Sequence, residues 1–175
     1  MVKVLALNGS PGSGKDLFVS CCQQLLGEDV CHNLSTVDYV KEIAKTLGWD
    51  GKKDARSRKF LSDLKDALTQ WRDLPFQDVT NKLMLIKKYA SKKGSDEVVF
   101  IHCREPEEIA KLVNRLGAEA IIIRRDAAED KEQSNHADER VFEYEYDIMI
   151  DNNGTVEDLL ENARVFLREE LGFNI

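Results

Sequence analysis

The chain has 175 residues, of which 42% are hydrophobic and 33% charged, with a formal net charge of −7 at pH 7. This length and composition predict one globular domain over residues 1–175 with a sizeable core. The acidic balance argues against binding to bulk nucleic acid or to anionic membranes. It leaves room for small anionic ligands held in a local cationic pocket.

The four cysteines, Cys21, Cys22, Cys31 and Cys103, show no C-x-x-C spacing. A disulfide framework or a cysteine metal site is therefore not expected, and a reduced, cytoplasmic setting fits better. We see no signal peptide and no apolar run long enough to span a membrane.

Apolar runs alternate with segments of helical periodicity along the chain. The expected strands are Val2–Leu7, Val30–Leu34, Val98–Cys103, Ala120–Ile123 and Asp147–Ile150. The expected helices cover residues 15–26, 39–47, 57–71, 77–92, 106–116 and 155–171.

Two helices carry clear boundary signals. Pro75 marks a break between the third and fourth helices, and Thr155 with Asp158 three residues on predicts a cap for the last helix. In the third helix, apolar side chains repeat at helical spacing from Phe60 to Trp71, which predicts a strongly amphipathic helix.

Alternating strands and helices predict an α/β fold with a parallel sheet covered on both faces. Ligands in such sheets bind at the carboxyl ends of the strands. The five expected strands would form one sheet between two layers of helices, which is a three-layer sandwich. This rule places the segment after Leu7, Arg104, Arg124, Arg125 and the turn at 152–154 on one edge of the sheet.

The segment after the first strand is glycine-rich and matches the phosphate-binding loop spacing G-x-x-x-x-G-K. Its candidate nucleotide contacts are Gly9, Gly12, Ser13, Gly14, Lys15 and Asp16. Phosphate oxygens need several backbone N–H donors in a concave arrangement, which a Cβ would obstruct. The N-terminus of the following helix adds positive potential, and Lys15 can reach the terminal phosphates. This motif is typical of the P-loop NTPase fold and predicts a site for nucleotide phosphates.

Asp16 stands where this motif usually has Ser or Thr as a magnesium contact. A carboxylate is a hard oxygen ligand that can hold Mg²⁺ directly or through water, and the sequence leaves both open. Its negative charge beside phosphates is tolerable chiefly with a metal ion or extra cations nearby. Asp16 is therefore the candidate metal ligand.

Arg124 and Arg125 open a polar segment over residues 124–145. Long loops inside compact domains are uncommon and often act as lids. Phosphoryl transfer needs cations that cover the transferring group, so both arginines are candidate catalytic residues with Lys15. The alternative is a solvated loop with surface ion pairs.

Several segments together resemble P-loop nucleotide kinases of the adenylate-kinase-like branch, and most of all the phage-type deoxynucleoside monophosphate kinases. These are the loop ending Gly14-Lys15-Asp16, Tyr39–Ala44, Arg58–Leu64, Arg104–Ile109, Asn135–Glu139 and Tyr146–Thr155. The loop ending is also similar to animal-type phosphomevalonate kinases, and the last segment to dephospho-coenzyme A kinase. The resemblance implies ATP, Mg²⁺, a lid and a small phosphorylated acceptor.

The resemblance places the acceptor over residues 35–75, with Lys41 and Arg58 as candidate contacts and Arg104 as a third at the sheet edge. Arg104 could equally pair with a neighbouring glutamate. The turn at 152–154 would lie beside the adenine, which makes Asn153 a candidate contact. His136 could be a lid contact or a surface residue.

His102 departs from the family pattern, because many P-loop enzymes have an aspartate near this strand end that holds magnesium through water. The expected activity is phosphoryl transfer from ATP to a small acceptor, first of all a (deoxy)nucleoside monophosphate. The alternatives are a regulatory nucleotide-binding module with little turnover, or a kinase of phosphomevalonate or dephospho-coenzyme A. A homodimer is left open.

Overall fold

A five-stranded, wholly parallel sheet forms the centre of the molecule in the computed structural model, which describes residues 1–129 and 140–175. The strands are β1 (Val2–Asn8), β2 (Cys31–Ser35), β3 (Glu97–His102), β4 (Glu119–Arg124) and β5 (Ile148–Asp151). Their order across the sheet is β2-β3-β1-β4-β5. The α/β class and the five parallel strands predicted from the sequence are confirmed.

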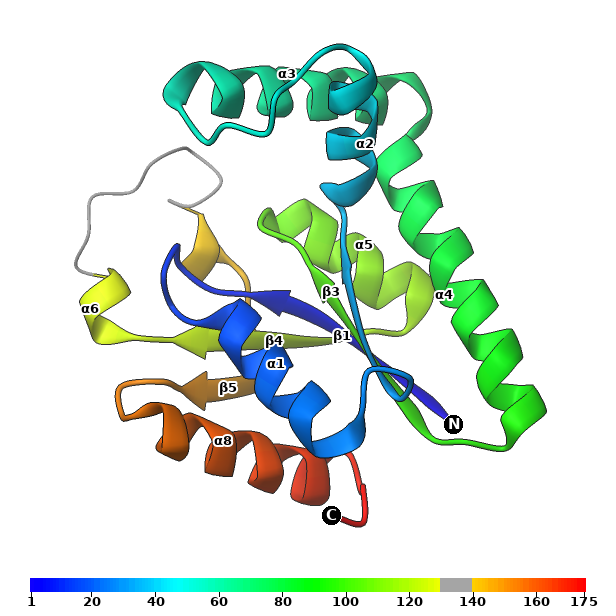
Figure 1. The fold of residues 1–175 in the computed structure, drawn as a ribbon, viewed down its shortest axis with the longest axis vertical. Helices are drawn as coiled ribbons and strands as arrows, with labels where there is room; N and C mark the ends of the chain where they lie inside the picture. The colour runs from blue at the N-terminus through cyan, green and yellow to red at the C-terminus, as the bar shows by residue number, and fades with distance from the viewer. Residues whose placement is uncertain (130–139) are drawn as a thin grey trace.

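The central strand β1 pairs with β3 on one side and β4 on the other, with Leu7 opposite both His102 and Ile121. Because all strands run the same way, the segments that follow them gather at one edge (Figure 1). β1 and β3 are almost fully buried, as expected for strands that are apolar on both faces.

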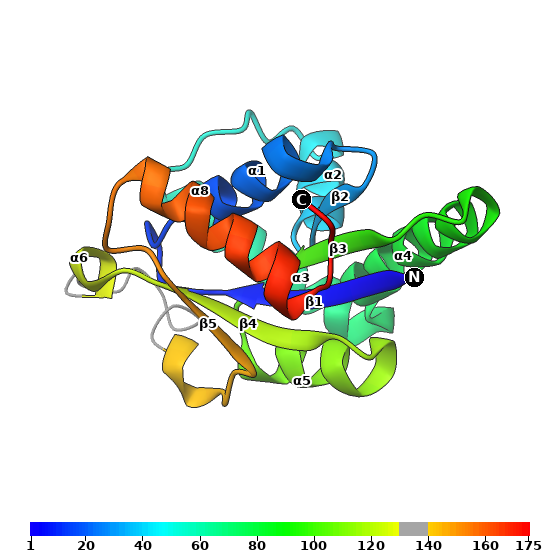
Figure 2. The same cartoon turned by 90° about the horizontal axis from the view of Figure 1, so that it is seen from below.

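One face of the sheet is covered by α1 (Lys15–Leu26) and α8 (Val156–Val165), which lie together on the same side in Figure 2. Rings from Phe18, Phe100 and Phe166 contact one another here, with centroids 5.6–6.3 Å apart. Such edge and tilted contacts are the favoured arrangements of buried aromatic rings. They join α1, β3 and the end of the chain in one core.

The last expected helix is divided in two. α8 is followed by one π-helical turn, Phe166–Glu170. The expected cap is present, since the Thr155 hydroxyl accepts from the Asp158 N–H and the Asp158 carboxylate accepts from the Thr155 N–H. This capping box satisfies two donors at the helix start.

The opposite face is covered by α4 (Leu74–Lys93) and α5 (Pro106–Leu116), whose apolar sides pack on β1, β3 and β4. Each helix has a proline in its first turn, where its missing N–H costs nothing. Pro75 therefore lies in the first turn of α4. The break between α3 and α4 is at Asp73, which has a positive φ of 53°. The expected start of α4 at residue 77 was three residues late.

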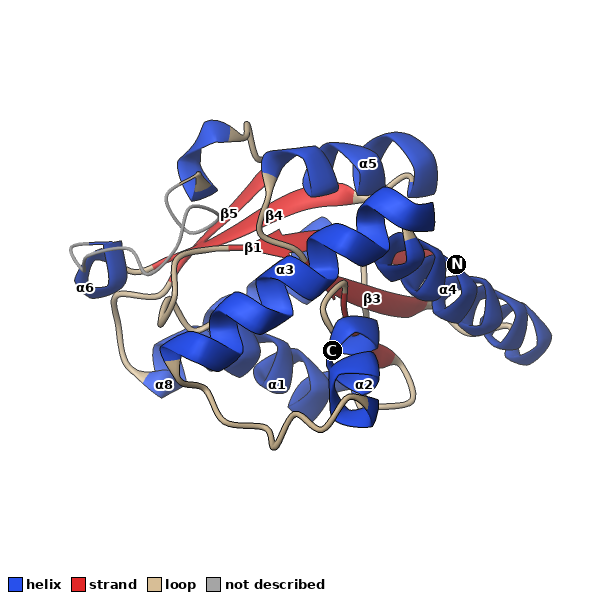
Figure 3. Ribbon diagram, turned by 90° about the horizontal axis from the view of Figure 1, so that it is seen from above, coloured by secondary structure: helices blue, strands red, loops and turns tan. Residues whose placement is uncertain are grey.

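α2 (Asp38–Thr46) and α3 (Ala55–Arg72) form an arm beyond the sheet. Figure 1 shows both above the strands, and Figure 3, viewed from that side, shows α3 crossing in front. No residue of α3 is buried, and Trp71 is 73% exposed. The predicted amphipathic helix is confirmed, with Phe60, Leu61, Leu64 and Leu68 half-buried, but Ala67 and Trp71 are exposed. The stripe is only half-buried because α3 packs on α2 and α4 and not on the sheet.

Between β4 and β5 the structure describes a short helix, α6 (Asp126–Glu129), and a 3-10 turn, η1 (Val141–Glu143). Residues 130–139, which include His136 and the middle of the expected lid, lie outside the described residues. Within the described part of the chain, no helix is long and apolar enough to cross a membrane.

Candidate functional site

The glycine-rich loop between β1 and α1 has the backbone that its sequence predicts. Gly9 and Gly14 have φ angles of +147° and +96°, a region that favours glycine. A Cβ on Gly9 would overlap the carbonyl oxygen of Ile123, and one on Gly14 would overlap the side-chain amide of Asn152. Glycine is required at both positions because residues at the ends of β4 and β5 lie where a Cβ would be.

Asn152 holds the loop from the far side of the sheet. It follows β5, is buried, and its Nδ2 donates to the Ser13 carbonyl oxygen at 2.7 Å. Its own N–H bonds the carbonyl of Arg124 at 2.8 Å, which ties it to β4. The loop therefore has a fixed partner from a segment about 140 residues later. The sequence predicted the neighbouring Asn153 as the candidate nucleotide contact. The sequence of the turn alone does not show which of the two asparagines contacts the loop.

Lys15 begins α1 and its side chain turns back over the loop. Its Nζ donates to the carbonyl oxygens of Gly9 at 2.5 Å and Ser10 at 3.0 Å. The ammonium is thus held directly above the concave loop backbone. Helix starts present N–H groups that have no acceptor within the helix, and these share the same space. The Lys15 ammonium and the N–H groups at the start of α1 therefore both contribute positive potential at the loop.

Three side-chain oxygens around the loop are buried without a hydrogen-bond partner among the described residues: Asn8 Oδ1, Ser10 Oγ and Ser13 Oγ. Leaving a buried polar atom unpaired costs about 1–3 kcal/mol. Clusters of such atoms are rare in folded cores, so they mark a place where another molecule completes the bonding. The observation fits a loop built around a polar ligand.

Asn8, Arg104 and Tyr146 form a network beneath the loop that sequence reasoning missed. Asn8 Nδ2 donates to the Arg104 carbonyl at 3.1 Å and to the Tyr146 hydroxyl at 2.8 Å. That hydroxyl donates in turn to the Val141 carbonyl at 2.6 Å. Burial raises the pKa of Tyr146, so it stays protonated as a donor. The network joins β1, β3 and the segment before β5.

Asp16 and His102 face each other at the loop. Asp16 lies in the first turn of α1 with its side chain 94% exposed, and His102 ends β3 with its side chain 15% exposed. Asp16 Oδ1 and His102 Nε2 are 3.8 Å apart. Burial lowers the pKa of His102, and the Asp16 carboxylate offsets this only in part. The imidazole is accordingly neutral at pH 7.

Arg124 ends β4 and is engaged by Glu129 of α6. Two parallel bonds, from Nε at 2.8 Å and from an Nη at 2.6 Å, join the guanidinium to that carboxylate. The bonds and charge of Glu129 raise the pKa of Arg124. The guanidinium also lies 5.5 Å from the Phe142 ring centroid. Arg125 is exposed, and its carbonyl accepts the N–H groups of Ala128 and Glu129.

The expected acceptor contacts lie on the α2–α3 arm. Lys41 on α2 is 3.9 Å from Asp38, and Arg58 lies on an exposed part of α3. Lys65 fixes the arm to the sheet edge, with Nζ 2.9 Å from Glu108 and 3.6 Å from Glu105. Burial lowers the pKa of Lys65, but the two carboxylates raise it overall. This mainly buried ion pair joins α3 to the start of α5.

Asn153 is exposed and takes part in its own turn. Its backbone and side-chain N–H groups donate to the Asp151 carboxylate, each at 2.9 Å. Its Oδ1 accepts the N–H of Asp126 at 2.9 Å. The amide therefore joins β5 to the start of α6, on the same edge as the loop.

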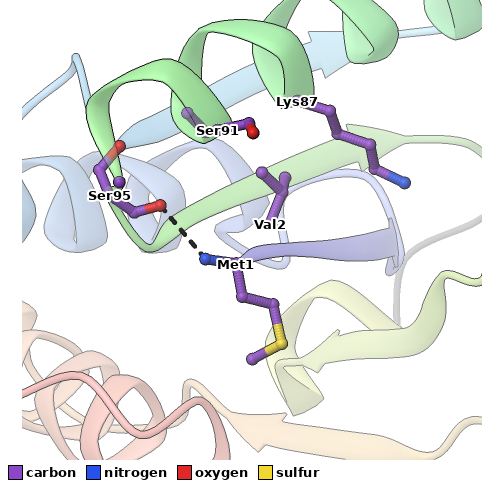
Figure 4. Close-up of a pocket in the computed structure, with 7 residues that line it drawn as sticks. Met1, Val2, Lys87, Ser91 and Ser95 are labelled. Carbon is purple, nitrogen blue, oxygen red and sulfur yellow. Dashed lines mark hydrogen bonds between the residues drawn. The ribbon is translucent and has the colours of Figure 1, made fainter.

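Two cavities among the described residues lie away from the glycine-rich loop. One, of about 360 Å³, is lined by residues that include Met1, Lys87 and Ser91 at the amino end of β1 (Figure 4). There the Met1 amine donates to the Ser95 carbonyl at 3.2 Å. The other, of the same volume, lies at Arg72, Phe76 and Arg115. Neither of these two is lined by residues of the glycine-rich loop.

The described residues contain no group of three or more histidine, cysteine, aspartate or glutamate side chains placed to hold a metal ion. Asp16 and His102 are a pair, and any ion between them would take its remaining ligands from elsewhere. Phosphate oxygens and water are the usual source at nucleotide sites. All four cysteines are buried free thiols.

Comparison with known proteins gives little beyond these observations. No family model matches the chain, and no curated protein matches it. Among solved structures, the chain is similar to a mutant of the APS kinase CysC from Mycobacterium tuberculosis, with 12% sequence identity and a TM-score of 0.41. The match covers 95% of this chain and 96% of that one. At this TM-score the likeness supports no argument, and the site is interpreted from its own geometry.

Proposed function

We propose that the protein transfers the γ-phosphoryl group of ATP to a small phosphorylated acceptor, most specifically a (deoxy)nucleoside monophosphate. The observation that carries the proposal is the loop from Gly9 to Lys15. It joins a buried strand to a helix N-terminus, requires glycine at two positions and has the Lys15 ammonium over its backbone. Each of these features suits a bound polyphosphate.

Lys15 has the central role in this proposal. Its ammonium donates to two neutral carbonyl oxygens, and phosphate oxygens are stronger acceptors that can replace them. In the transition state, charge accumulates on the transferring phosphoryl oxygens and the leaving oxygen of ADP. A cation fixed at that point lowers the barrier without covalent chemistry by the protein.

Asp16 is the residue that would hold Mg²⁺, and the ion would supply charge neutralisation on the phosphates when bound. The fit is supported by the exposed carboxylate beside the loop, since a second negative charge next to polyphosphate is favourable only with a cation nearby. With the ion bound, Asp16 would help to orient the nucleotide through it, and Lys15 would do so by direct contact.

Arg124, Arg125 and Arg104 are the proposed additional cations. Each follows a strand at the carboxyl edge of the sheet, the edge from which the loop projects. Arg124 would exchange the Glu129 carboxylate for phosphate, keeping its bidentate geometry. Asn153 is proposed to lie beside the adenine, because its turn also carries Asn152, which contacts the loop.

The acceptor is proposed to bind between the loop and the α2–α3 arm, with Lys41 and Arg58 as contacts. Support comes from the arm's position at the sheet edge and from its lack of buried residues in α3. A helix that is not part of the core can adjust its position when a ligand binds. Lys65 would keep the arm attached while this happens.

A coupled assay of ADP release tests the proposal. The full chain is incubated with ATP and Mg²⁺ and a panel of ribo- and deoxynucleoside monophosphates, phosphomevalonate and dephospho-coenzyme A. We expect release that depends on one acceptor class and falls at least about a hundredfold in Lys15→Ala. Release that is equal in wild type and Lys15→Ala would contradict it.

A second candidate function is a nucleotide-binding regulatory module with little turnover. The observation that favours it is His102 at the end of β3, where a neutral imidazole stands near the loop. In that case ATP binds and depends on Lys15, while the whole acceptor panel gives no ADP. The same assay, run beside a binding titration, therefore separates the two functions.

A further inference from the structure

His102 presents an unused ring nitrogen to the loop. Its Nε2 is buried and makes no hydrogen bond within the described residues, and the nearest carboxylate oxygen is Asp16 Oδ1 at 3.8 Å. That separation is too long for a hydrogen bond. A buried ring nitrogen without a partner needs an explanation, and water or an ion between the two groups supplies one.

The imidazole is fixed in place by its backbone. The His102 carbonyl accepts the Thr36 N–H at 3.2 Å and the Thr36 hydroxyl at 3.5 Å, and Leu7 pairs with His102 across the sheet. Asp16 is the opposite case, since its side chain is almost wholly exposed and free to turn about χ1. A fixed nitrogen and an adjustable carboxylate can together fit an ion between them.

We infer that Asp16 and His102 form a mixed oxygen–nitrogen pair that selects a transition-metal ion, such as Co²⁺ or Mn²⁺, over Mg²⁺ at the nucleotide site. The inference rests on the proposed function, because the nucleotide supplies the remaining ligands. Imidazole suits transition metals, whereas Mg²⁺ prefers oxygen throughout its coordination shell. An all-oxygen site would lack the nitrogen ligand that strengthens this preference.

Shared ligation of one ion requires Asp16 to move toward His102. Metal–ligand bonds of about 2.1 Å place neighbouring octahedral ligands about 3 Å apart and opposite ones about 4.2 Å apart. The distance of 3.8 Å between Asp16 Oδ1 and His102 Nε2 matches neither spacing. Rotation of the exposed Asp16 side chain is the change that would bring the two atoms to the shorter spacing.

Local charge favours a divalent cation here. The groups that act on His102 are Asp16 and Lys15 from α1 and, farther away, Asp38 and Lys41 from α2. Their charges cancel, so the phosphates of a bound nucleotide would leave the site strongly negative. A divalent ion at the Asp16–His102 pair offsets that charge.

The test compares metal affinities in the complex of the full chain with ATP. Dissociation constants for Co²⁺ and Mg²⁺ are measured by competition in wild type, His102→Gln and His102→Asp. We expect His102→Gln to weaken Co²⁺ about tenfold or more and to leave Mg²⁺ within about twofold. His102→Asp supplies oxygen, and its preference should shift toward Mg²⁺.

A spectroscopic measurement tests directly whether His102 binds the metal ion. Pulsed EPR on the Mn²⁺·ATP complex should show ¹⁵N coupling when the protein's histidines are ¹⁵N-labelled. The coupling should persist in His32→Gln and vanish in His102→Gln. His32 is a matched control because it lies on β2, hydrogen-bonded to Glu97 at the amino end of β3.

The outcomes separate the inference from the function it rests on. Nucleotide binding that depends on Lys15, with the same Co²⁺ and Mg²⁺ affinities in wild type and His102→Gln and no histidine coupling, overturns the inference alone. Failure of wild type to bind ATP with any metal overturns the proposed function and this inference with it.

Discussion

The side-chain amide of Asn152 donates a hydrogen bond of 2.7 Å to the carbonyl oxygen of Ser13. The two residues lie on the segments that follow β5 and β1, on opposite sides of β4. One bond therefore joins the glycine-rich loop to the far side of the sheet. It also explains Gly14, since a Cβ at that position would occupy the place of the amide.

Asn152→Ala should destabilise the protein by about 1–3 kcal/mol, because a buried carbonyl loses its donor. The loss is measured as a lower midpoint in urea denaturation. ATP affinity should fall as well, since the loop loses its fixed shape. Asn153→Ala is the control. Its amide is exposed, so the stability change should be clearly smaller, and equal losses would argue against the Asn152 bond.

Gly14→Ala should cost more stability than Gly12→Ala. Both have positive φ angles, and left-handed backbone costs a residue with a Cβ about 1–2 kcal/mol. Only Gly14 has a neighbour in the way, because nothing lies within 4 Å of a Cβ at Gly12. Adding Asn152→Ala to Gly14→Ala removes the overlapping amide. The double variant should thus lose less than the sum of the single losses in unfolding free energy.

Glu129→Gln should release Arg124 from its carboxylate partner. If Arg124 binds phosphate in the working enzyme, the variant no longer exchanges an intramolecular ion pair for the nucleotide, and KM for ATP should fall severalfold. Steady-state kinetics measures this. Glu143→Gln is the control, since Glu143 pairs with Arg140. An unchanged KM for ATP in Glu129→Gln would contradict the proposal that Arg124 binds phosphate.

Acid should loosen the turn that carries Asn152. Hydrogen bonds from the Thr155 backbone and side chain lower the pKa of Asp158 below its ordinary value. A carboxyl with a lowered pKa when folded adds stability above its unfolded pKa, and that stability is lost as pH falls through the folded value. The loss therefore lies below about pH 4. Asp158→Asn should flatten this part of a pH–stability curve, and an unchanged slope would contradict the assignment.

The sheet, the loop and the last helix cap could be predicted because each depends on local sequence. β-branched runs such as Val98–Ile101 and the spacing of Gly9, Gly14 and Lys15 are complete signals within a few residues. The same holds for Thr155 and Asp158. Hydrophobic periodicity predicted the helix α3 but not the surface on which it packs, because an apolar stripe can pack on another helix as well as on a sheet.

The partners of the loop could not be predicted, because they depend on strand order and on side-chain direction. Asn8, Tyr146 and Asn152 meet the site only after β4 is placed between β1 and β5. The pairing of Arg124 with Glu129 likewise depends on the turn of α6. The sequence showed arginines at the right strand ends but not which carboxylates hold them.

Isothermal titration with ATP, comparing wild type with Lys15→Ala, tests the central claim most directly. Lys87→Ala is the matched control, because Lys87 lies on α4 beside the cavity at the amino end of β1. We predict that ATP binds to wild type and to Lys87→Ala with the same affinity. Its affinity for Lys15→Ala should be at least about tenfold lower. Equal ATP affinity in wild type and Lys15→Ala would contradict a phosphate site at this loop.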